Sequence, residues 1–240
     1  MDKTPSFVKD GNGPAAVVTG SSSGIGQTIA ERLLEDGWVV HGFDIAAPRV
    51  HHPRFHAVHV DLGDGQATSE AALRCNHVDA LIHAAGMLRV GRLGSLRPED
   101  ADLMWRLHVA AALRLADVLL PAMAARRAGR VVLIGSRVAQ GKAGRSQYAA
   151  TKAALIALAR SWAAEVVADG VTVNVVSPAA TQTAMLDDPG RSSETAQVPP
   201  IGRLIQPREV AAMVAFLLSE SAGAVTGQDI QICGGSSLAR

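Results

Sequence analysis

Short apolar runs alternate with longer alanine- and leucine-rich segments along most of the chain. The short runs are rich in valine and isoleucine, which is typical of strands covered on both faces of a parallel sheet. The longer segments carry apolar residues at helical spacing. The predicted strands are 15–20, 38–44, 55–61, 78–86, 129–136, 171–178 and 228–233, and the predicted helices are 25–37, 65–75, 98–125, 147–169 and 207–219.

This alternation predicts an α/β fold: a doubly wound parallel sheet of about seven strands, with helices on both faces. No internal repeat or linker divides the chain, so residues 14–240 are predicted to form a single domain after a flexible segment at 1–13. The stretch 184–206 is rich in Pro, Ser and Asp and too long for an ordinary connection, so it is either a mobile lid or a disordered loop. Its position after a predicted strand favours a substrate lid, because ligands bind at the carboxyl ends of strands in open α/β sheets.

Composition and charge argue against several classes of function. The chain has 23 Lys and Arg against 22 Asp and Glu and no basic block, so we expect no nucleic-acid or membrane partner. Cys75 and Cys233 lie outside any metal-ligand spacing, which suits a reducing compartment and predicts no metal site. The polar start of the chain has no apolar signal core, and no apolar run reaches the ~18–20 residues of a membrane span. We therefore expect a cytoplasmic protein.

The segment VVTGSSSGIG (17–26) places Gly20, Gly24 and Gly26 between a predicted strand and a predicted helix. Small residues let the backbone turn sharply and approach a pyrophosphate, and the helix N-terminus presents free N–H groups and a partial positive charge. The alternative is a plain turn that happens to contain three glycines. The position in the first strand–helix unit favours a dinucleotide site.

Asp44 ends the second predicted strand, 18 residues after Gly26. A carboxylate there can accept hydrogen bonds from the hydroxyls of an adenosine ribose, and it would repel a 2′-phosphate. No Lys or Arg between Thr19 and Gln27 offsets that repulsion. We therefore expect NAD as the cofactor rather than NADP, and Arg49 is the one nearby residue that could reverse this preference.

The segment QYAATK (147–152) contains the only tyrosine of the chain, four positions before Lys152. On a helix these two side chains share one face, and a nearby ammonium favours the phenolate. Such a phenol can take a proton from an alcohol as hydride leaves the carbon, or give one to a carbonyl in reverse. Ser136 closes the preceding strand and could hold the substrate oxygen. The alternative, in which Tyr148 merely packs and Lys152 is solvated, is weakened by Ser136 and the glycine-rich loop.

Together these residues resemble the short-chain dehydrogenase/reductase family. The matching elements are T-G-x-x-x-G-x-G at 19–26, Asp61, A-A-G at 84–86, Ser136, Tyr148-x-x-x-Lys152, NVVSPAATQT at 174–183 and VTGQDIQICGG at 225–235. The resemblance runs from about residue 14 to the end of the chain. It implies a one-domain Rossmann fold, a homotetramer or homodimer, and hydride transfer between a nicotinamide and an alcohol or carbonyl.

The resemblance also implies roles for individual residues. Tyr148 would be the acid/base, Lys152 would bind the ribose and tune the tyrosine, and Ser136 would orient the substrate oxygen. Asp61 would contact adenine, and Thr183 would hold the cofactor near its carboxamide or phosphates. The implied cofactor site comprises Gly20, Ser22, Ser23, Gly24, Ile25, Gly26, Asp44, Asp61, Leu62, His83, Ala84, Ala85, Gly86, Tyr148, Lys152, Pro178, Ala179, Thr181 and Thr183.

Three positions depart from the family pattern. His83 stands where the family usually has an Asn, and its ring can supply a donor in place of the amide. Ala179 replaces a glycine, which disfavours positive φ but leaves backbone contacts available. His108 occupies the place of a fourth catalytic residue, an Asn whose backbone carbonyl helps hold a water between lysine and solvent. We expect His108 to act in catalysis, with an imidazole able to relay protons near neutral pH and to add an ionisation to the pH profile; the alternative is a packing histidine in a helix kink.

Three functions are consistent with these residues. The leading one is an NAD(H)-dependent oxidoreductase that interconverts a small-molecule secondary alcohol or cyclic diol and its ketone, with Tyr148 as acid/base. A second is an NADPH-dependent ketoreductase such as a 3-oxoacyl reductase, against which Asp44 argues. A third is a protein that binds NAD(H) without turnover and signals through a partner. The substitutions at His83, His108 and Ala179 motivate this third function, and the presence of Ser136, Tyr148 and Lys152 argues against it.

Overall fold

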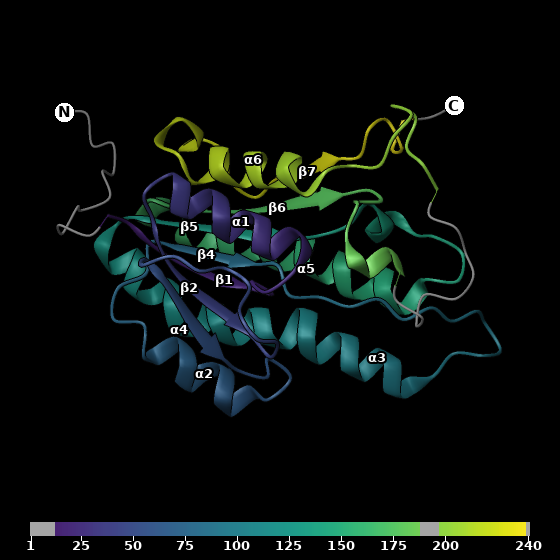
Figure 1. The fold of residues 1–240 in the computed structure, drawn as a ribbon, viewed down its shortest axis with the longest axis horizontal. Helices are drawn as coiled ribbons and strands as arrows, with labels where there is room; N and C mark the ends of the chain where they lie inside the picture. Colours follow the sequence, from purple (N-terminus) through teal and green to yellow (C-terminus); the bar gives the residue numbers. More distant parts are fainter. Residues whose placement is uncertain (1–12, 188–196, 239–240) are drawn as a thin grey trace.

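A parallel sheet of seven strands lies at the centre of the computed structural model, which describes residues 13–187 and 197–238 (Figure 1). The strands are β1 (Ala15–Thr19), β2 (Val39–Asp44), β3 (Phe55–His59), β4 (Ala80–His83), β5 (Gly129–Ile134), β6 (Val171–Pro178) and β7 (Asp229–Ile232). They lie in the order β3-β2-β1-β4-β5-β6-β7, so the direction of winding reverses between β1 and β4. An open sheet of this kind binds its ligand at that reversal. The predicted doubly wound parallel sheet is confirmed.

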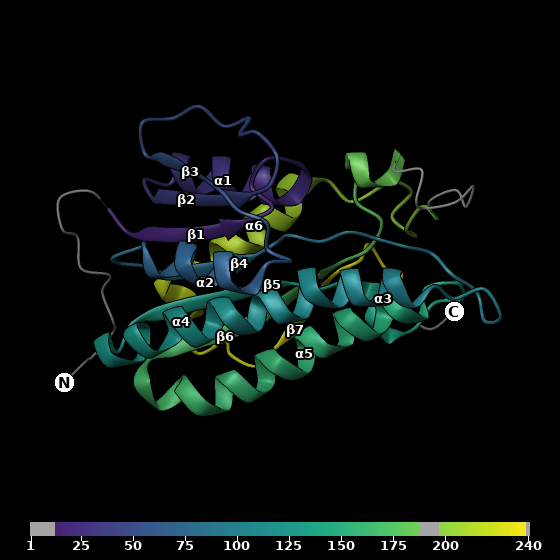
Figure 2. The same cartoon turned by 90° about the horizontal axis from the view of Figure 1, so that it is seen from below.

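Helices cover both faces of the sheet (Figures 1 and 2). On one face α1 (Gly24–Glu35) packs against α6 (Pro207–Leu218), and on the other lie α2 (Gly65–Leu73), α4 (Ala111–Arg126) and α5 (Ser146–Val166). Successive strand residues point to opposite faces, so Val17 of β1 belongs to the apolar core with α4 and α5, whereas Val18 belongs to the core with α1 and α6. These two cores hold the strand ends in place on both sides.

The segment predicted as one helix at 98–125 is interrupted. Its first part, α3 (Pro98–Trp105), passes into a π-helical turn, η1 (Arg106–Ala110), before α4 begins. Taken together, α3, η1 and α4 form a helical run, Pro98–Arg126, that by length and composition alone could cross a membrane, which the sequence analysis did not anticipate. Half of its most apolar stretch is buried inside the protein, which is the pattern of a core helix.

Other element ends follow the sequence signals. α5 passes into the 3-10 turn η3 (Val167–Asp169) and stops at Gly170, which adopts a φ of 72°. At the start of α6, Glu209 accepts a hydrogen bond from the backbone N–H of Gln206 at 2.8 Å. Further 3-10 turns are η2 (Arg137–Gln140), η4 (Ala184–Asp187) and η6 (Glu220–Ala222). The predicted flexible segment 1–13 lies almost wholly outside the described residues, as does the stretch 188–196 of the predicted lid.

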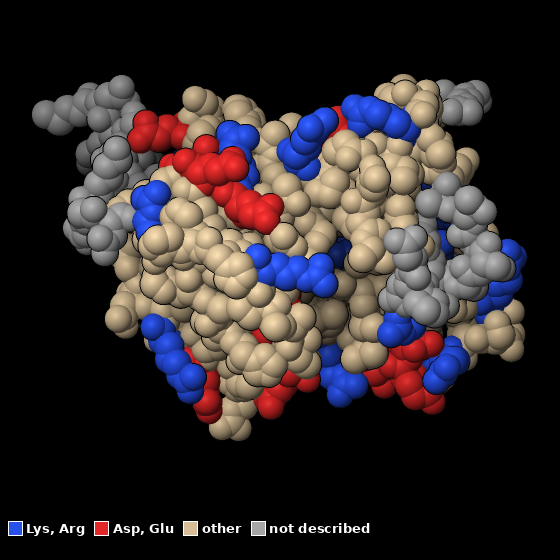
Figure 3. Space-filling model, viewed as in Figure 1, with Lys and Arg blue, Asp and Glu red and all other residues tan. Residues whose placement is uncertain are grey.

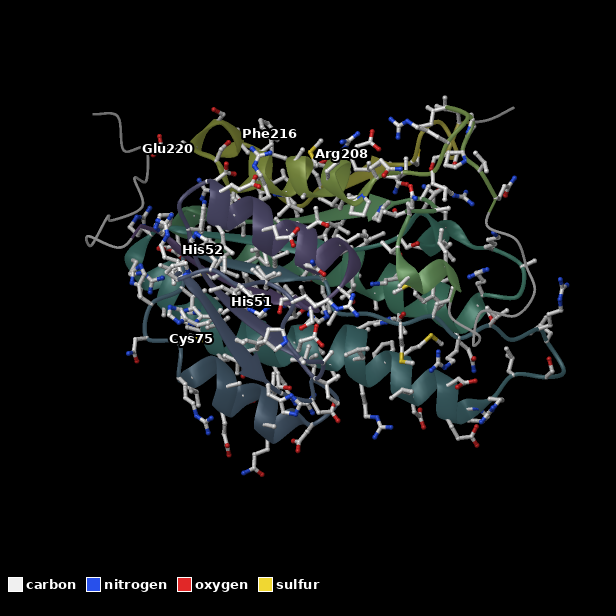
Figure 4. The ribbon with its side chains drawn as sticks, viewed as in Figure 1. His51, His52, Cys75, Arg208, Phe216 and Glu220 are labelled. Carbon is white, nitrogen blue, oxygen red and sulfur yellow. The ribbon has the colours of Figure 1, made fainter. Side chains whose placement is uncertain are left out.

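The described surface carries both basic and acidic side chains. On the described part of the face in Figure 3, basic and acidic side chains lie in small mixed groups. His51 and His52 are exposed in the loop before the edge strand β3 (Figure 4).

Burial raises the pKa of the Cys75 thiol to about 11, so this thiol stays protonated. Within residues 13–187 and 197–238, no group of three or more His, Cys, Asp or Glu side chains could hold a metal ion.

Candidate active site

A cavity of about 490 Å³ opens at the carboxyl ends of the central strands. Its walls come from the loops after β1, β4, β5 and β6 and from the first turns of α1 and α5. The structure therefore brings together most of the residues that the sequence analysis selected. Those lining the cavity are Gly20, Ser23, Gly24, Ile25, Gly26, Ala84, Ala85, Gly86, Ser136, Tyr148, Lys152, Pro178, Ala179, Thr181 and Thr183.

The glycine-rich loop after β1 exposes its backbone to this cavity. Gly20 and Gly24 have φ values of 67° and 53°, a region that favours glycine. A Cβ on Gly26 would collide with the carbonyl oxygen of Gly20, so only glycine lets α1 begin this close to β1. The first turn of α1, all of it described, contains no acidic side chain, and the Ser23 side chain does not cap it. The helix end is thus suited to a phosphate group.

Asp44 turns its carboxylate back onto the glycine-rich loop. Its Oδ2 accepts a hydrogen bond from the backbone N–H of Ser22, and its Oδ1 accepts one from Ala46, both at 2.9 Å. The side chain lines a smaller hollow of about 120 Å³ beside the main cavity, together with Ser22 and His59. Arg49 is exposed. Asp44 is therefore held at a fixed place at the end of β2.

Ser136, Tyr148 and Lys152 form the opposite wall. Tyr148 and Lys152 lie one turn apart on α5, with the Lys152 Nζ 5.8 Å from the centre of the Tyr148 ring. Ser136 follows β5, and its Oγ accepts a hydrogen bond from the backbone N–H of Val138 at 3.2 Å. All three side chains are at most 9% exposed. A hydroxyl, a phenol and an ammonium thus share one sheltered wall, as the spacing predicts.

Lys152 is buried and held by the sheet. Its Nζ donates a hydrogen bond to the backbone carbonyl oxygen of Ile134, the last residue of β5, at 2.8 Å. Burial lowers the pKa of Lys152 to about 8. At neutral pH the side chain therefore remains an ammonium, although its proton is held less tightly than in solution.

His108 lies in η1 and is buried behind the cavity wall. Its Nε2 accepts a hydrogen bond from the backbone N–H of Met87 at 2.9 Å, and its Nδ1 lies 2.8 Å from the Thr151 Oγ1. Burial, and then the charge of Lys152, lowers the pKa of His108 well below its ordinary value. The imidazole stays neutral with both nitrogens engaged. This arrangement fits the packing alternative, and a part for His108 in proton transfer stays a prediction.

His83, the last residue of β4, is also buried. Its Nε2 lies 3.0 Å from the carbonyl oxygen of His108, and its Nδ1 lies 3.0 Å from the Thr19 Oγ1. The Thr19 hydroxyl also accepts hydrogen bonds from the backbone N–H groups of Ala84 and Ala85, at 3.0 and 2.9 Å. His83 is only 1% exposed and does not line the cavity, so its direct contact with the cofactor stays a prediction. It supports the backbone that does line the cavity.

Comparison with known proteins decides the family. A family model described as enoyl-(acyl carrier protein) reductase matches residues 20–237. The 3-oxoacyl-(acyl-carrier-protein) reductase FabG of Vibrio cholerae serotype O1 is 37% identical over 239 residues, which cover 93% of this chain and 97% of that protein. The chain belongs to the short-chain dehydrogenase/reductase family.

Two further relatives agree with this assignment. The 2,3-dihydro-2,3-dihydroxybenzoate dehydrogenase of Escherichia coli strain K12 is 34% identical over an alignment 246 positions long, gaps included. The alignment covers 95% of this chain and 99% of that protein. A solved structure described as a short chain dehydrogenase/reductase family protein superimposes with a TM-score of 0.86 at 33% identity, covering 93% of this chain and 97% of that one. The Rossmann-type fold expected for this family is therefore confirmed.

Besides His83, two residues expected from the short-chain dehydrogenase/reductase pattern do not line either hollow. Asp61 is exposed after β3, and its Oδ1 accepts a hydrogen bond from the backbone N–H of Gly63 at 2.8 Å. Leu62 is buried in the core with Val60 and Ala72. Their contacts with the adenine of a dinucleotide stay predictions.

The substrate end of the cavity contains residues that the family motifs do not include. Leu88, Arg137 and Val138 line it from the segments that follow β4 and β5. Lys142, Arg145, Ser236 and Leu238 also line it; they come from a loop and a chain end without a motif, and no local signal could have selected them. Arg203 donates hydrogen bonds to both carboxylate oxygens of Glu209, at 2.7 and 2.8 Å.

The described ends of the predicted lid contact this site. Met185 and Leu186 in η4 and Gln197, Val198 and Pro200 in the returning segment line the cavity. Backbone pairing between Thr181 and Ile205 and a hydrogen bond of 3.1 Å from the Ile201 N–H to the Gly234 carbonyl fix this returning segment. Both ends of the segment are thus anchored beside the cavity, while its closure over a substrate stays a prediction.

Proposed function

We propose that this protein is an NAD(H)-dependent oxidoreductase that interconverts a secondary alcohol and the corresponding ketone. The observation that carries the proposal is the placing of Ser136, Tyr148 and Lys152 on the wall of the same cavity as the glycine-rich loop. A sheltered phenol beside a buried ammonium suits proton transfer to or from a substrate oxygen. The exposed loop backbone suits a pyrophosphate.

The chain's own residues account for the proton. Ser136 would hold the substrate oxygen beside the Tyr148 phenol. During oxidation the phenolate takes the hydroxyl proton as the C–H bond breaks, so that the oxygen–carbon bond becomes a carbonyl. Lys152 favours the phenolate by its charge and can pass the proton onward, since its own pKa is about 8. A bound nicotinamide would supply the hydride acceptor, or the hydride donor in reverse.

Asp44 supports the choice of NAD. Its carboxylate is fixed at the end of β2 by two backbone N–H groups, so it cannot swing away easily from a ribose placed against the glycine-rich loop. A 2′-phosphate at that ribose would meet this negative charge. Arg49 is exposed and could offset the repulsion only by folding back over Asp44.

The substrate end supports an alcohol with a ring and a polar substituent. Leu88, Val138, Met185 and Leu186 supply apolar wall, and Arg137 supplies a cation whose Nη1 lies 3.4 Å from the Ser236 carbonyl oxygen. A relative 34% identical to this chain is named for 2,3-dihydro-2,3-dihydroxybenzoate, a cyclic diol that carries a carboxylate. We propose a cyclic alcohol or diol as the substrate class.

A second candidate is reduction of a 3-oxoacyl thioester with NADPH. The relative that is 37% identical is named as a 3-oxoacyl-(acyl-carrier-protein) reductase. The two candidates differ in the cofactor that Asp44 should accept.

We also propose a cytoplasmic location and a homotetramer or homodimer. Size-exclusion chromatography with light scattering tests the oligomeric state.

The experiment is a fluorescence titration of the purified protein with NADH and then with NADPH, followed by turnover. We expect NADH to bind at least about tenfold more tightly, or about 1.4 kcal/mol. NAD⁺-driven oxidation should then occur with one or more members of a panel of secondary alcohols, cyclic diols and hydroxy acids, and should be lost in Tyr148→Phe. Preference for NADPH with reduction of a 3-oxoacyl thioester would instead establish the second candidate. Binding of NADH without turnover of either panel would favour a sensing role.

A further inference from the structure

Two buried histidines connect the strand ends to the catalytic helix. His83 at the end of β4 bonds to the backbone carbonyl of His108, and the His108 ring bonds to Thr151 on α5. The Thr151 hydroxyl in turn donates to the backbone carbonyl oxygen of Tyr148 at 2.9 Å. A continuous series of hydrogen bonds therefore runs from the sheet through the π-helical turn to the backbone of Tyr148.

The backbone partners determine where each ring carries its proton. A carbonyl oxygen can only accept, so His83 is protonated on Nε2. A backbone N–H can only donate, so the Nε2 of His108, which accepts from Met87, is bare, and the neutral ring carries its proton on Nδ1. The threonines complete this pattern, because Thr19 donates to His83 while Thr151 accepts from His108. The two rings are opposite tautomers.

We propose that His83 and His108 are a coupled pair of positioning residues, whose opposite neutral tautomers hold the π-helical turn and the first turn of α5 so that the Tyr148 phenol faces the cavity. The effect of the pair on turnover rests on the proposed function. The tautomers and their effect on the tyrosine ring do not. Single π-helical turns inside α-helices are frequent at functional sites, and this one occurs where the His108 carbonyl is engaged by a side chain from the sheet.

The His108 ring also acts on Tyr148 by direct contact. The two ring centres lie 5.7 Å apart with the planes at 87°, an edge-to-face arrangement. A Cβ at Gly86 would lie 3.3 Å from the His108 Nε2 and 3.5 Å from the Lys152 Nζ, so the imidazole fills the space behind the cavity wall next to both catalytic groups. Displacement of the His108 ring would therefore change the surroundings of the Tyr148 phenol.

Neutrality is part of the arrangement. From α5 the titratable groups beside the pair are Lys152 and Tyr148, and each histidine faces the other. Protonation of His108 would displace the Met87 N–H from Nε2, and protonation of either ring would place a second positive charge near Lys152. Burial and the Lys152 charge accordingly lower the pKa of both histidines. Lys152 thus remains the cation that acts on the phenol.

The tautomers can be read directly by nitrogen NMR of protein labelled with ¹⁵N-histidine. The resonances that vanish in His83→Asn should report a ring protonated on Nε2, and those that vanish in His108→Asn a ring protonated on Nδ1. Neither set should move between about pH 5.5 and 8, because both rings stay neutral there. Two rings of the same tautomer, or titration of either near pH 6.5, would overturn the proposal. No cofactor or substrate is needed.

Positioning of the phenol is tested with fluorotyrosine, which labels Tyr148 alone because the chain has one tyrosine. We expect the single ¹⁹F resonance to move or broaden in His83→Asn, His108→Asn and Thr151→Val. The matched control is His77→Asn, which removes a histidine bonded to Asp79 at the amino end of the sheet. An unchanged resonance in His108→Asn would contradict the positioning role, even if the protein proves to have another activity.

Turnover supplies the third measurement once a substrate is known. We expect His83→Asn and His108→Asn each to lower kcat about tenfold to a hundredfold, as for a misplaced reacting group, while the Kd for NADH stays within about twofold. The double variant should lose no more than the worse single variant, because the residues act as one unit. Losses that multiply in the double variant would show independent residues and overturn the coupling.

Discussion

The Lys152 ammonium donates a hydrogen bond to the Ile134 carbonyl across 2.8 Å. This contact ties α5 to β5, two residues before Ser136, so the groups expected to handle the proton and the substrate oxygen share one support. The ammonium is buried, and burial works against its charge. Burial of this ammonium therefore lowers the free energy of unfolding, and that loss can be measured.

Replacing Lys152 should stabilise the protein while abolishing its chemistry. The pKa is about 8 in the folded chain against an ordinary value of 10.5, so burying the charged form costs up to about 3 kcal/mol below pH 8. Between pH 8 and 10.5 the unfolded chain binds more protons than the folded one, so stability should rise with pH across that window. Urea denaturation should show this rise in the native protein and not in Lys152→Met. Equal pH dependence of the two proteins would show that the ammonium is solvated.

The buried histidines predict a pH dependence of the same sign in acid, where stability should be lost as the pH falls. The pKa of His83 is lowered to about 3 and that of His108 also lies well below 6.5, so below pH 6.5 the unfolded chain takes up protons that the folded chain refuses. Stability should therefore fall as the pH falls, by about 2 kcal/mol at pH 5 for His83 and in the same direction for His108. Denaturant midpoints between pH 7 and 5 should fall less steeply in His83→Asn and in His108→Asn than in His77→Asn. An equal slope in all three would rule out buried neutral rings.

The part of the site that could be predicted from the sequence is the part with local spacing. The glycine-rich loop and the Tyr148–Lys152 pair can be recognised in the sequence because their geometry depends on one turn or on one helix face. The π-helical turn at Arg106–Ala110 has no local signal beyond the suggested kink at His108, since it involves a hydrogen bond from His83, 25 residues before His108. The neutral state of His108 likewise depends on Met87 and on Thr151, 43 residues later.

The strand predicted at 78–86 also combines a feature that local sequence predicts with one that depends on a distant residue. Its apolar run continues to Gly86, but the strand stops at His83. The next two N–H groups bond to the Thr19 hydroxyl instead of a neighbouring strand, which turns the backbone of 84–86 along the cavity. Apolarity could locate the strand, but its end depends on a partner from β1.

Gly26→Ala should damage both the fold and the cofactor site. The added Cβ would collide with the Gly20 carbonyl, and it would approach the Thr19 oxygen to 3.0 Å, so α1 must move away from β1. We expect a loss of about 1–3 kcal/mol in stability, as for overpacking, and loss of NADH binding. Gln27→Ala places the same residue one position later and should leave NADH affinity intact. Tight binding by Gly26→Ala would mean that the cofactor does not use this close approach.

Asp44→Asn should relax the choice between the two dinucleotides. The amide removes the negative charge but keeps one oxygen for the backbone N–H of Ser22 or Ala46. NADH affinity should fall about tenfold because a hydrogen bond to a charged acceptor is lost, whereas NADPH affinity should rise as the repulsion of its 2′-phosphate is removed. Fluorescence titration with both nucleotides measures the ratio, and Asp36→Asn, a change of the same charge at the exposed end of α1, is the control. If the ratio stays the same in Asp44→Asn, a residue other than Asp44 reads the ribose, and Arg49 becomes the residue to change next.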